Sequence, residues 1–304
     1  MKQKLVGEVI YYCRKDKKIS QTQLSKGLCS ISTLSRIESG ERSVDSLLVE
    51  NLLQRLGKSS EQFEFVLDYV DFKLSNLRYE IMVNLNNRND DLVNEQLNTY
   101  RELADSASKI HLQFISMVEI ELLMRENANS KQLNEKARKV VKLTIPDFTM
   151  DQPSGISNYS LYEVRCILHT ILTMESIQEQ CALIGDLYHY VEINYDSILL
   201  GMVGPEILYH YARILLQCKE YQKAIDYCDT GIAIIQKAKS FMCCADICYV
   251  QACAIYQLID DASLKDSRLV LKAQERIRQA YWTYMMEGNQ DMISKIEQTW
   301  KELI

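Results

Sequence analysis

The chain has 304 residues but only 3 prolines and 10 glycines, so it is long enough for one to three domains and poor in helix breakers. No run approaches the roughly 18 apolar residues of a membrane-spanning helix, and the N-terminal segment MKQKLVGEVIYYCRKDKK lacks the apolar core of a signal peptide. The net charge of −6 is uneven: residues 1–60 hold 11 basic and 6 acidic side chains, and the remainder holds 24 and 35. We therefore expect a nearly all-α protein with a basic head and an acidic body.

The first part of the chain predicts a small helical head. Ser20 and Ser30 are predicted N-caps, because each hydroxyl can accept a bond from an N–H of the following helical turn. Gly27 falls at the turn between two short helices, and Gly40 ends the second of them. The predicted helices are about Lys4–Lys15, Gln21–Leu28, Ile31–Ser39, Asp45–Leu56 and a fifth from Ser59 or Ser60 to about Tyr69.

The third of these helices has two chemically different faces. Leu34 and Ile37 lie three residues apart and are expected to point inward. Ser32, Thr33 and Arg36 share the opposite face, where small hydroxyls and one long Arg suit close approach to phosphates and a guanine edge. The alternative is an ordinary solvated face of a small helical domain.

These residues resemble the Xre/lambda-repressor-like DNA-binding domains, through SQTQLSKGL, SISTLSRIESGER and SLLVENLLQRLG. The resemblance implies a five-helix DNA-binding domain over residues 1–68. It also implies that Arg14 and Glu38 form an internal structural pair. The DNA contacts that it implies are Gln21 to phosphate, Ser32 and Thr33 to phosphate or a base edge, Arg36 to a base edge, Ile31 to a thymine methyl, and Arg42 and Ser43 to the backbone.

From Asp71 onward the sequence shows helical patterns of 12 to 20 residues between short polar breaks. The breaks predict about eleven helices, arranged as five antiparallel pairs and one at the end, which is typical of a solenoid. One predicted break runs from Leu199 to Pro205, so that Pro205 opens a helix at an N1-like position.

The clearest pair, Pro205–Lys237, resembles a tetratricopeptide repeat (TPR). Small residues stand at the spacing of that repeat, at Ala212, Ala224 and Gly231. Similar positions follow at Ala252, Ala273 and Ala280. We therefore expect residues 69–304 to form a TPR-like right-handed helical solenoid.

Helical repeats present a concave groove, lined chiefly by the first helix of each pair. Tyr, Arg and carboxylate side chains there suit a peptide, because aromatic rings take apolar side chains and polar groups bind the peptide backbone. The alternative is that these residues simply pack against neighbouring helices. The candidates are Arg165, His169, Glu206, Tyr209, Arg213, Asp246, Tyr249 and Tyr256.

No motif for catalysis or for metal binding is found. The sequence has no Gly-rich phosphate loop, HExxH or GxSxG. Its 10 Cys form no CxxC pair, and no His lies near the cluster of cysteines from Cys243 to Cys253. We therefore expect reduced thiols in the core. We expect no enzyme, no cofactor and no metal.

The order of domains and the length resemble the Rgg/PlcR/PrgX-like (RRNPP) peptide-pheromone-responsive regulators. The resemblance implies a cytoplasmic, homodimeric quorum-sensing transcription regulator that binds double-stranded DNA at operator half-sites and a short signalling peptide. It also implies that residues 69–304 serve peptide binding and dimerisation. The alternatives are an Xre-type repressor whose TPR body binds a protein partner, or a regulator that interacts with a phosphorelay. Trp282, Tyr284 and Trp300 in the last helices offer apolar area for the dimer contact, or equally a capping core for the last repeat.

Overall fold

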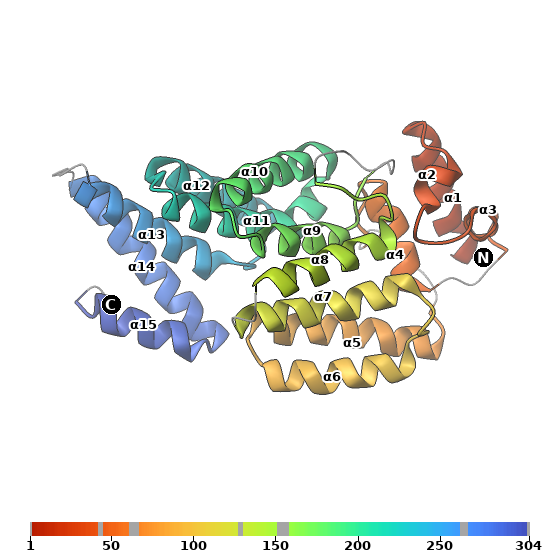
Figure 1. Cartoon of the computed structure of the whole chain (residues 1–304), viewed down its shortest axis with the longest axis horizontal. Coiled ribbons are helices and arrows are strands. Elements are labelled where there is room, and N and C mark those ends of the chain that lie inside the picture. The colour runs from red at the N-terminus through yellow and green to blue at the C-terminus, as the bar shows by residue number, and fades with distance from the viewer. Residues whose placement is uncertain are drawn as a thin grey trace. The chain divides into compact units, whose positions relative to one another are not determined.

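The computed structural model describes residues 2–41, 45–60, 67–126, 130–150, 158–261 and 267–302, and these ranges contain α-helices and no β-strand (Figure 1). The chain divides into two compact units, residues 1–175 and 176–304. The predicted domain boundary after residue 68 lies inside the first unit. Among the helices of the described ranges, none is both long and apolar enough to cross a lipid bilayer.

The first unit begins with a four-helix head. Its helices pack around a core that includes Ile10, Leu24, Leu34 and Leu52. Most of the predicted fifth helix lies at residues 61–66, outside the described ranges. The helices of the head are α1 (Lys2–Asp16), α2 (Gln21–Ser25), α3 (Ile31–Glu38) and α4 (Ser46–Arg55).

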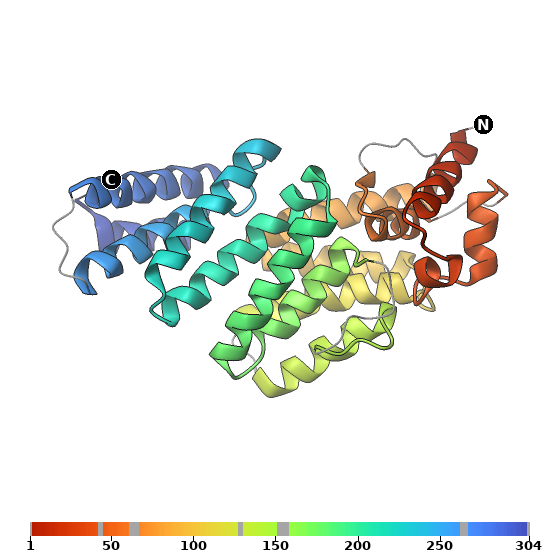
Figure 2. The same ribbon diagram turned by 90° about the horizontal axis from the view of Figure 1, so that it is seen from above.

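Five further helices complete the first unit. Neighbours in sequence pack together as α5 with α6 and α7 with α8, and α9 contacts both α7 and α8 (Figure 2). Asp68 caps α5 by accepting bonds from the N–H groups of Val70 and Asp71. These helices are α5 (Tyr69–Asn86), α6 (Asp90–Leu103), α7 (Lys109–Arg125), α8 (Ser130–Thr144) and α9 (Leu161–Leu172).

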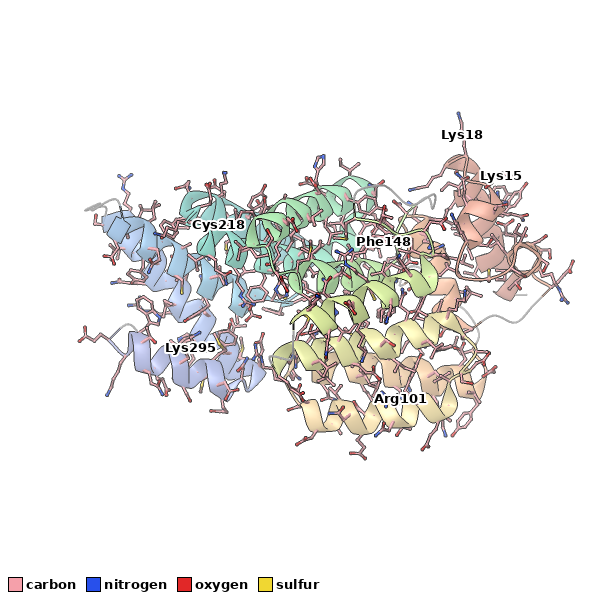
Figure 3. All side chains as sticks on the ribbon, in the orientation of Figure 1. Lys15, Lys18, Arg101, Phe148, Cys218 and Lys295 are labelled. Carbon is pink, nitrogen blue, oxygen red and sulfur yellow. The ribbon has the colours of Figure 1, made fainter. Side chains whose placement is uncertain are left out.

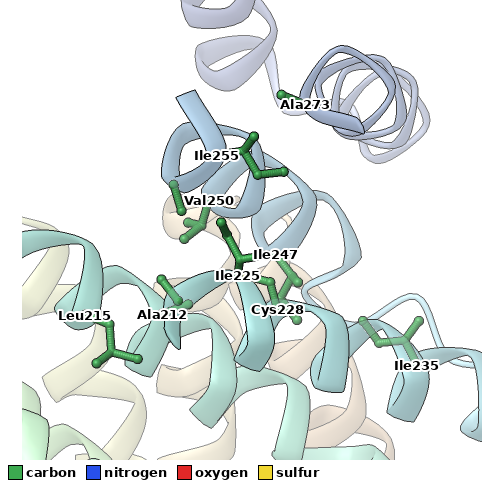
Figure 4. Close-up of a cluster of buried hydrophobic side chains, with 11 residues drawn as sticks. Ala212, Leu215, Ile225, Cys228, Ile235, Ile247, Val250, Ile255 and Ala273 are labelled. Carbon is green, nitrogen blue, oxygen red and sulfur yellow. The ribbon is translucent and has the colours of Figure 1, made fainter. Parts of the chain in front are cut away.

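The second unit is a succession of six helices around a core of small and aliphatic side chains (Figure 4). All the predicted alanines of the repeats are fully buried there, and Gly231 packs against Ile247, where an added Cβ would lie 2.9 Å from Cδ1. The six helices are α10 (Ile177–Asn194), α11 (Ser197–Gln217), α12 (Tyr221–Ala238), α13 (Cys244–Asp261), α14 (Ser267–Glu287) and α15 (Gln290–Trp300).

The described ranges from Tyr69 onward therefore contain eleven helices, α5 to α15, as predicted. The predicted break from Leu199 to Pro205 is wrong, because Pro205 lies inside α11. Leu199, Val203 and Ile207 are fully buried, so packing stabilises a helix that propensity alone would end. The ring of Pro205 lies against the backbone carbonyl of the residue four positions earlier, which is Gly201. Because Gly201 has no side chain, the helix can also approach Ala238 closely.

Candidate nucleic-acid interface and repeat-body face

The segment from Ser20 to Glu38 is built by local hydrogen bonds. Ser20 Oγ accepts from Gln23 N at 3.1 Å, and Gln23 Oε1 accepts from Ser20 N at 2.9 Å, which completes a capping box on α2. Ser30 Oγ accepts from Thr33 N at 3.0 Å and caps α3. Gly27 occupies the left-handed region (φ +76°) between the helices, which only glycine adopts without strain. The sequence thus specifies two short helices and the turn between them.

Helix α3 has the two faces that the sequence predicts. Leu34 and Ile37 are buried in the head core. Ile31, Ser32 and Arg36 are exposed on the other side, and Thr33 is half-buried beside Ser30, with 2.8 Å between their hydroxyl oxygens. Four residues on one short helix therefore offer a hydroxyl-rich surface with one guanidinium.

Ser35 is also exposed on α3, next to Arg36. Sequence reasoning missed it, although its spacing of three residues from Ser32 places it on the same face. It extends the hydroxyl-bearing surface by one turn of the helix.

The predicted pair of Arg14 and Glu38 joins the end of α1 to the end of α3. Arg14 Nε donates to Glu38 Oε1 at 2.7 Å and Nη2 donates to Oε2 at 2.8 Å, and both side chains are buried. The hydrogen bond to Glu38 raises the pKa of Arg14. Gln21 Nε2 also donates to Glu38 Oε2, at 2.8 Å, so the first residue of α2 is joined to the same carboxylate.

The remaining residues predicted for DNA contact, Arg42 and Ser43, lie outside the described residues. At the end of α1, Lys15 and Lys18 project from the head into solvent (Figure 3). These lysines add positive charge to the head, as the sequence counts indicate.

The head is fixed to the rest of the first unit by Arg55, the last residue of α4. Both Arg55 and Glu163 of α9 have 0% side-chain exposure, and the guanidinium donates to both oxygens of the Glu163 carboxylate. It also donates to the carbonyls of Leu24 and Lys26 in the head, at 3.2 and 2.7 Å, and of Thr144 at the end of α8, at 3.1 Å. One side chain therefore links the turn before α3 to two helices of the body.

Burial and the charge of Arg55 have opposite effects on the pKa of the Glu163 carboxyl. Burial alone would raise the pKa of Glu163, but the charge and hydrogen bonds of Arg55 outweigh it and lower the pKa. The Glu163 carboxylate also accepts from Ser160 N at 2.7 Å, which caps α9. The link is therefore an ion pair at neutral pH.

A second polar junction surrounds the start of α4. His111 of α7 bridges Asp45, the N-cap of α4, and Tyr100 of α6, with both N–O distances at 2.6 Å. Burial opposes the charged form of Asp45, but the hydrogen bond from His111 lowers its pKa. These contacts tie the start of α4 to α6 and α7.

Next to that junction, Asp71 of α5 accepts from Ser46 N at 3.0 Å and from Ser46 Oγ at 2.8 Å. Arg78 Nη2 donates to the same hydroxyl at 2.8 Å. Burial raises the pKa of Asp71. Both ends of α4 are thus held by buried polar contacts to the body.

In the second unit, the predicted groove residues of α11 lie together. Arg213 is exposed and stacks over the Tyr209 ring, with its guanidinium carbon 5.4 Å from the centroid. Glu206 is half-buried one turn earlier. On α13, Asp246 accepts from the Tyr284 hydroxyl of α14 at 2.8 Å. This face carries aromatic rings, one cation and carboxylates.

Tyr249 and Tyr256 do not lie open beside them, because they face α15. Lys295 lies over the Tyr249 ring at 5.2 Å, and Trp300 stacks on Tyr256 at 4.5 Å between centroids. Tyr284 and Trp300 belong to the core that α15 closes, whereas Trp282 is exposed. Tyr284 and Trp300 therefore belong to a core that caps the last repeat, as in the second of the two alternatives from the sequence.

In the first unit, Arg165 is half-buried. His169 is buried, and its Nε2 lies 3.0 Å from Glu121 Oε2. The structure thus gives no support to His169 as a ligand-binding residue. Within the described ranges, no group of three or more His, Cys, Asp or Glu side chains is arranged to hold a metal ion.

Residues 10–63 match a family model described as helix-turn-helix. They form a helix-turn-helix domain. The domain includes α2, α3 and α4. Helix α3 is the second helix of the motif, and its exposed face belongs to that helix. No curated protein sequence matches the chain.

Solved structures resemble the chain over almost its whole length. PlcR of Bacillus thuringiensis in complex with the peptide PapR7 and DNA is 13% identical, and the match covers 96% of this chain and 99% of PlcR with a TM-score of 0.60. PlcR in its apo form is 12% identical, and the match covers 98% of this chain and 99% of PlcR with a TM-score of 0.56. ComR from Streptococcus suis is 17% identical, and the match covers 100% of this chain and 96% of ComR with a TM-score of 0.46. The chain thus shares the fold of PlcR, a helix-turn-helix head followed by a helical repeat body.

Proposed function

We propose that this chain is a DNA-binding transcription regulator whose repeat body binds a short signalling peptide and thereby controls promoter binding. The observation that carries the proposal is the exposed hydroxyl and guanidinium face of α3 within a matched helix-turn-helix domain. The fold of PlcR, a protein solved with a peptide and DNA, supports the same assignment. The chain would act in the cytoplasm, where the DNA of a bacterial regulator lies.

On DNA, α3 would enter the major groove. Arg36 would read a guanine edge through its paired N–H donors, and Ser32 and Thr33 would contact phosphate or a base edge. Ile31 would touch a thymine methyl, Gln21 would contact phosphate, and Arg42 and Ser43 would reach the backbone. To these the structure adds Ser35, which is exposed beside Arg36.

The Arg14–Glu38 pair has a different role. Because it is buried and joins α1 to α3, it would fix those two helices against each other and not touch DNA. The bond from Gln21 to Glu38 would orient Gln21 toward the phosphate that it contacts. The head is only mildly basic, so two heads on two half-sites, in a homodimer, would supply the affinity.

A peptide would bind the face of the second unit that carries Glu206, Tyr209, Arg213 and Asp246. The Arg213–Tyr209 stack places a cation and an aromatic ring side by side, which suits the carboxylate and apolar side chains of a peptide. Tyr249 and Tyr256 would join this site only if α15 moved, because α15 covers both rings. The chain would act by binding and not by catalysis.

Fluorescence anisotropy tests this proposal. The probe is DNA from the region upstream of the protein's own gene, titrated with and without a synthetic peptide from an adjacent short reading frame. We expect specific DNA binding whose affinity changes with the peptide. Arg213→Ala should weaken the peptide response and leave binding without peptide unchanged. DNA binding with no peptide response would favour a protein partner for the body, and no specific DNA binding would contradict the proposal.

A further inference from the structure

Helix α5 carries an apolar face that is largely exposed in the described part of the chain. Tyr69, Phe72, Asn76, Tyr79 and Val83 lie on one side of it, and we call this set the α5 seam. The side chains of Tyr69, Phe72 and Tyr79 are 70%, 50% and 73% exposed. The opposite side of α5, which includes Leu74, Ile81 and Leu85, is buried in the first unit. The helix is therefore apolar on two faces, and only one of them is covered.

The spacing of the α5 seam is the spacing of a helix-to-helix contact. Its residues follow one another at intervals of three, four, three and four, which are the a and d positions of a heptad. Four of the five are apolar, and the fifth, Asn76, is the kind of polar residue that fixes the register of such contacts. An extended peptide would not require this spacing over four helical turns.

Charges beside the seam favour a second copy of α5 as the partner. Lys73 and Glu80 stand seven residues apart at the same heptad position on one flank, and both are exposed. If two α5 helices pair antiparallel, with Asn76 of one opposite Tyr79 of the other, Lys73 of each copy lies beside Glu80 of its partner. The symmetric contact therefore forms the same opposite-charge pair twice.

Their present contacts leave both groups available for this pairing. Lys73 Nζ lies 4.6 Å from the Tyr69 ring centroid, and Glu80 Oε2 accepts from Gln96 of α6 at 3.1 Å. Both contacts lie at the surface, where they contribute little to stability. The Lys73 charge already lies against the ring that a partner helix would cover.

We propose that the α5 seam docks antiparallel onto the α5 seam of a second copy of this chain. The three rings of each copy are 50 to 73% exposed, so at about 200 Å² for a full ring the six rings of the pair would bury roughly 800 Å². A specific interface needs about 1,200 Å², so the flanking side chains must contribute the remainder. A contact of this size is weak alone and is strengthened when two heads are held on adjacent half-sites. The inference rests on the homodimer of the proposed function and names its surface.

The test is a photo-crosslinking experiment on the full chain. The photoreactive residue p-benzoylphenylalanine replaces Asn76, and unlabelled protein is mixed with protein labelled with ¹⁵N before irradiation. Mass spectrometry then reads which peptides are joined between copies. We expect an α5–α5 crosslink that reaches the segment around Tyr79. The matched control carries the photoreactive residue at Asn94, an exposed position on α6, and should give no such crosslink.

Charge reversal supplies an independent readout. By analytical ultracentrifugation, Lys73→Glu should weaken the dimer about tenfold or more, and Lys73→Glu with Glu80→Lys should restore it. Both positions are on the surface, so circular dichroism should show unchanged helicity. Crosslinks that join other surfaces, or a double variant as weak as the single one, would overturn the α5 seam. A chain that is monomeric at all concentrations would overturn it as well, while binding to a single half-site would still test the DNA-binding proposal separately.

Discussion

Replacing Arg55 with Met should strongly destabilise the first unit. The substitution keeps most of the apolar volume but removes the guanidinium from a site with 0% exposure. It leaves the Glu163 carboxylate buried without a cation, and it leaves the carbonyls of Leu24, Lys26 and Thr144 without this donor. We therefore expect a free energy of unfolding lower by about 3–5 kcal/mol, which is the cost of breaking a buried ion pair from one side.

The assay is guanidinium denaturation followed by circular dichroism. Lys26→Met is the matched control, because Lys26 pairs with Asp147 at the surface, with 34% and 65% of the two side chains exposed. That pair should contribute less than about 1 kcal/mol. The double variant Arg55→Met, Glu163→Leu should recover part of the lost stability, because it removes both charges from the buried site.

Two results would refute this reasoning. One is an Arg55→Met variant that loses no more stability than Lys26→Met. The other is a double variant as unstable as the single one, since the cost would then not come from an unpaired Glu163 carboxylate.

Three further predictions concern the same unit. Arg14→Ala should lower the free energy of unfolding by about 3–5 kcal/mol and weaken DNA affinity as a second, smaller effect, as denaturation and anisotropy can measure together. Gly27→Ala should cost more than Gly288→Ala, because both glycines have φ above +70° but only at Gly27 would the Cβ lie 1.9 Å from Thr144 O. The lowered pKa of Glu163 contributes stability that is present above its ordinary pKa of about 4.5 and is lost as the pH falls toward the folded value. Unfolding experiments between about pH 5 and 3 should therefore show a shallower loss for Glu163→Gln than for the unmodified chain, and equal slopes would contradict the assignment.

The sequence predicted the parts of the fold that local chemistry decides. Ser20, Ser30 and Gly27 determine the helix-turn-helix geometry through bonds and dihedral angles within a few residues. The buried alanines of the repeats were predictable because a small residue is required wherever two helices approach closely. The pairing of Arg14 with Glu38 was expected from the family resemblance and is present in the structure.

Contacts between distant residues were not predictable in the same way. Arg55 and Glu163 are 108 positions apart, and no local pattern indicates that they pair. Tyr249 and Tyr256 have the helical spacing of groove residues, but α15 folds back over them, and no local pattern indicates that return. Pro205 reads as a helix start by propensity, and only the buried side chains on both sides of it explain why α11 continues.

The central claim is that the exposed face of α3 reads DNA. The most direct measurement is a footprint on the upstream region of the protein's own gene, made with the unmodified chain, Arg36→Ala and the control Arg101→Ala. The control removes the same charge from α6, where Arg101 pairs with Glu119. We predict protected half-sites for the unmodified chain and for Arg101→Ala, and loss of protection for Arg36→Ala with an unchanged melting temperature. An Arg36→Ala footprint identical to that of the unmodified chain would contradict the account.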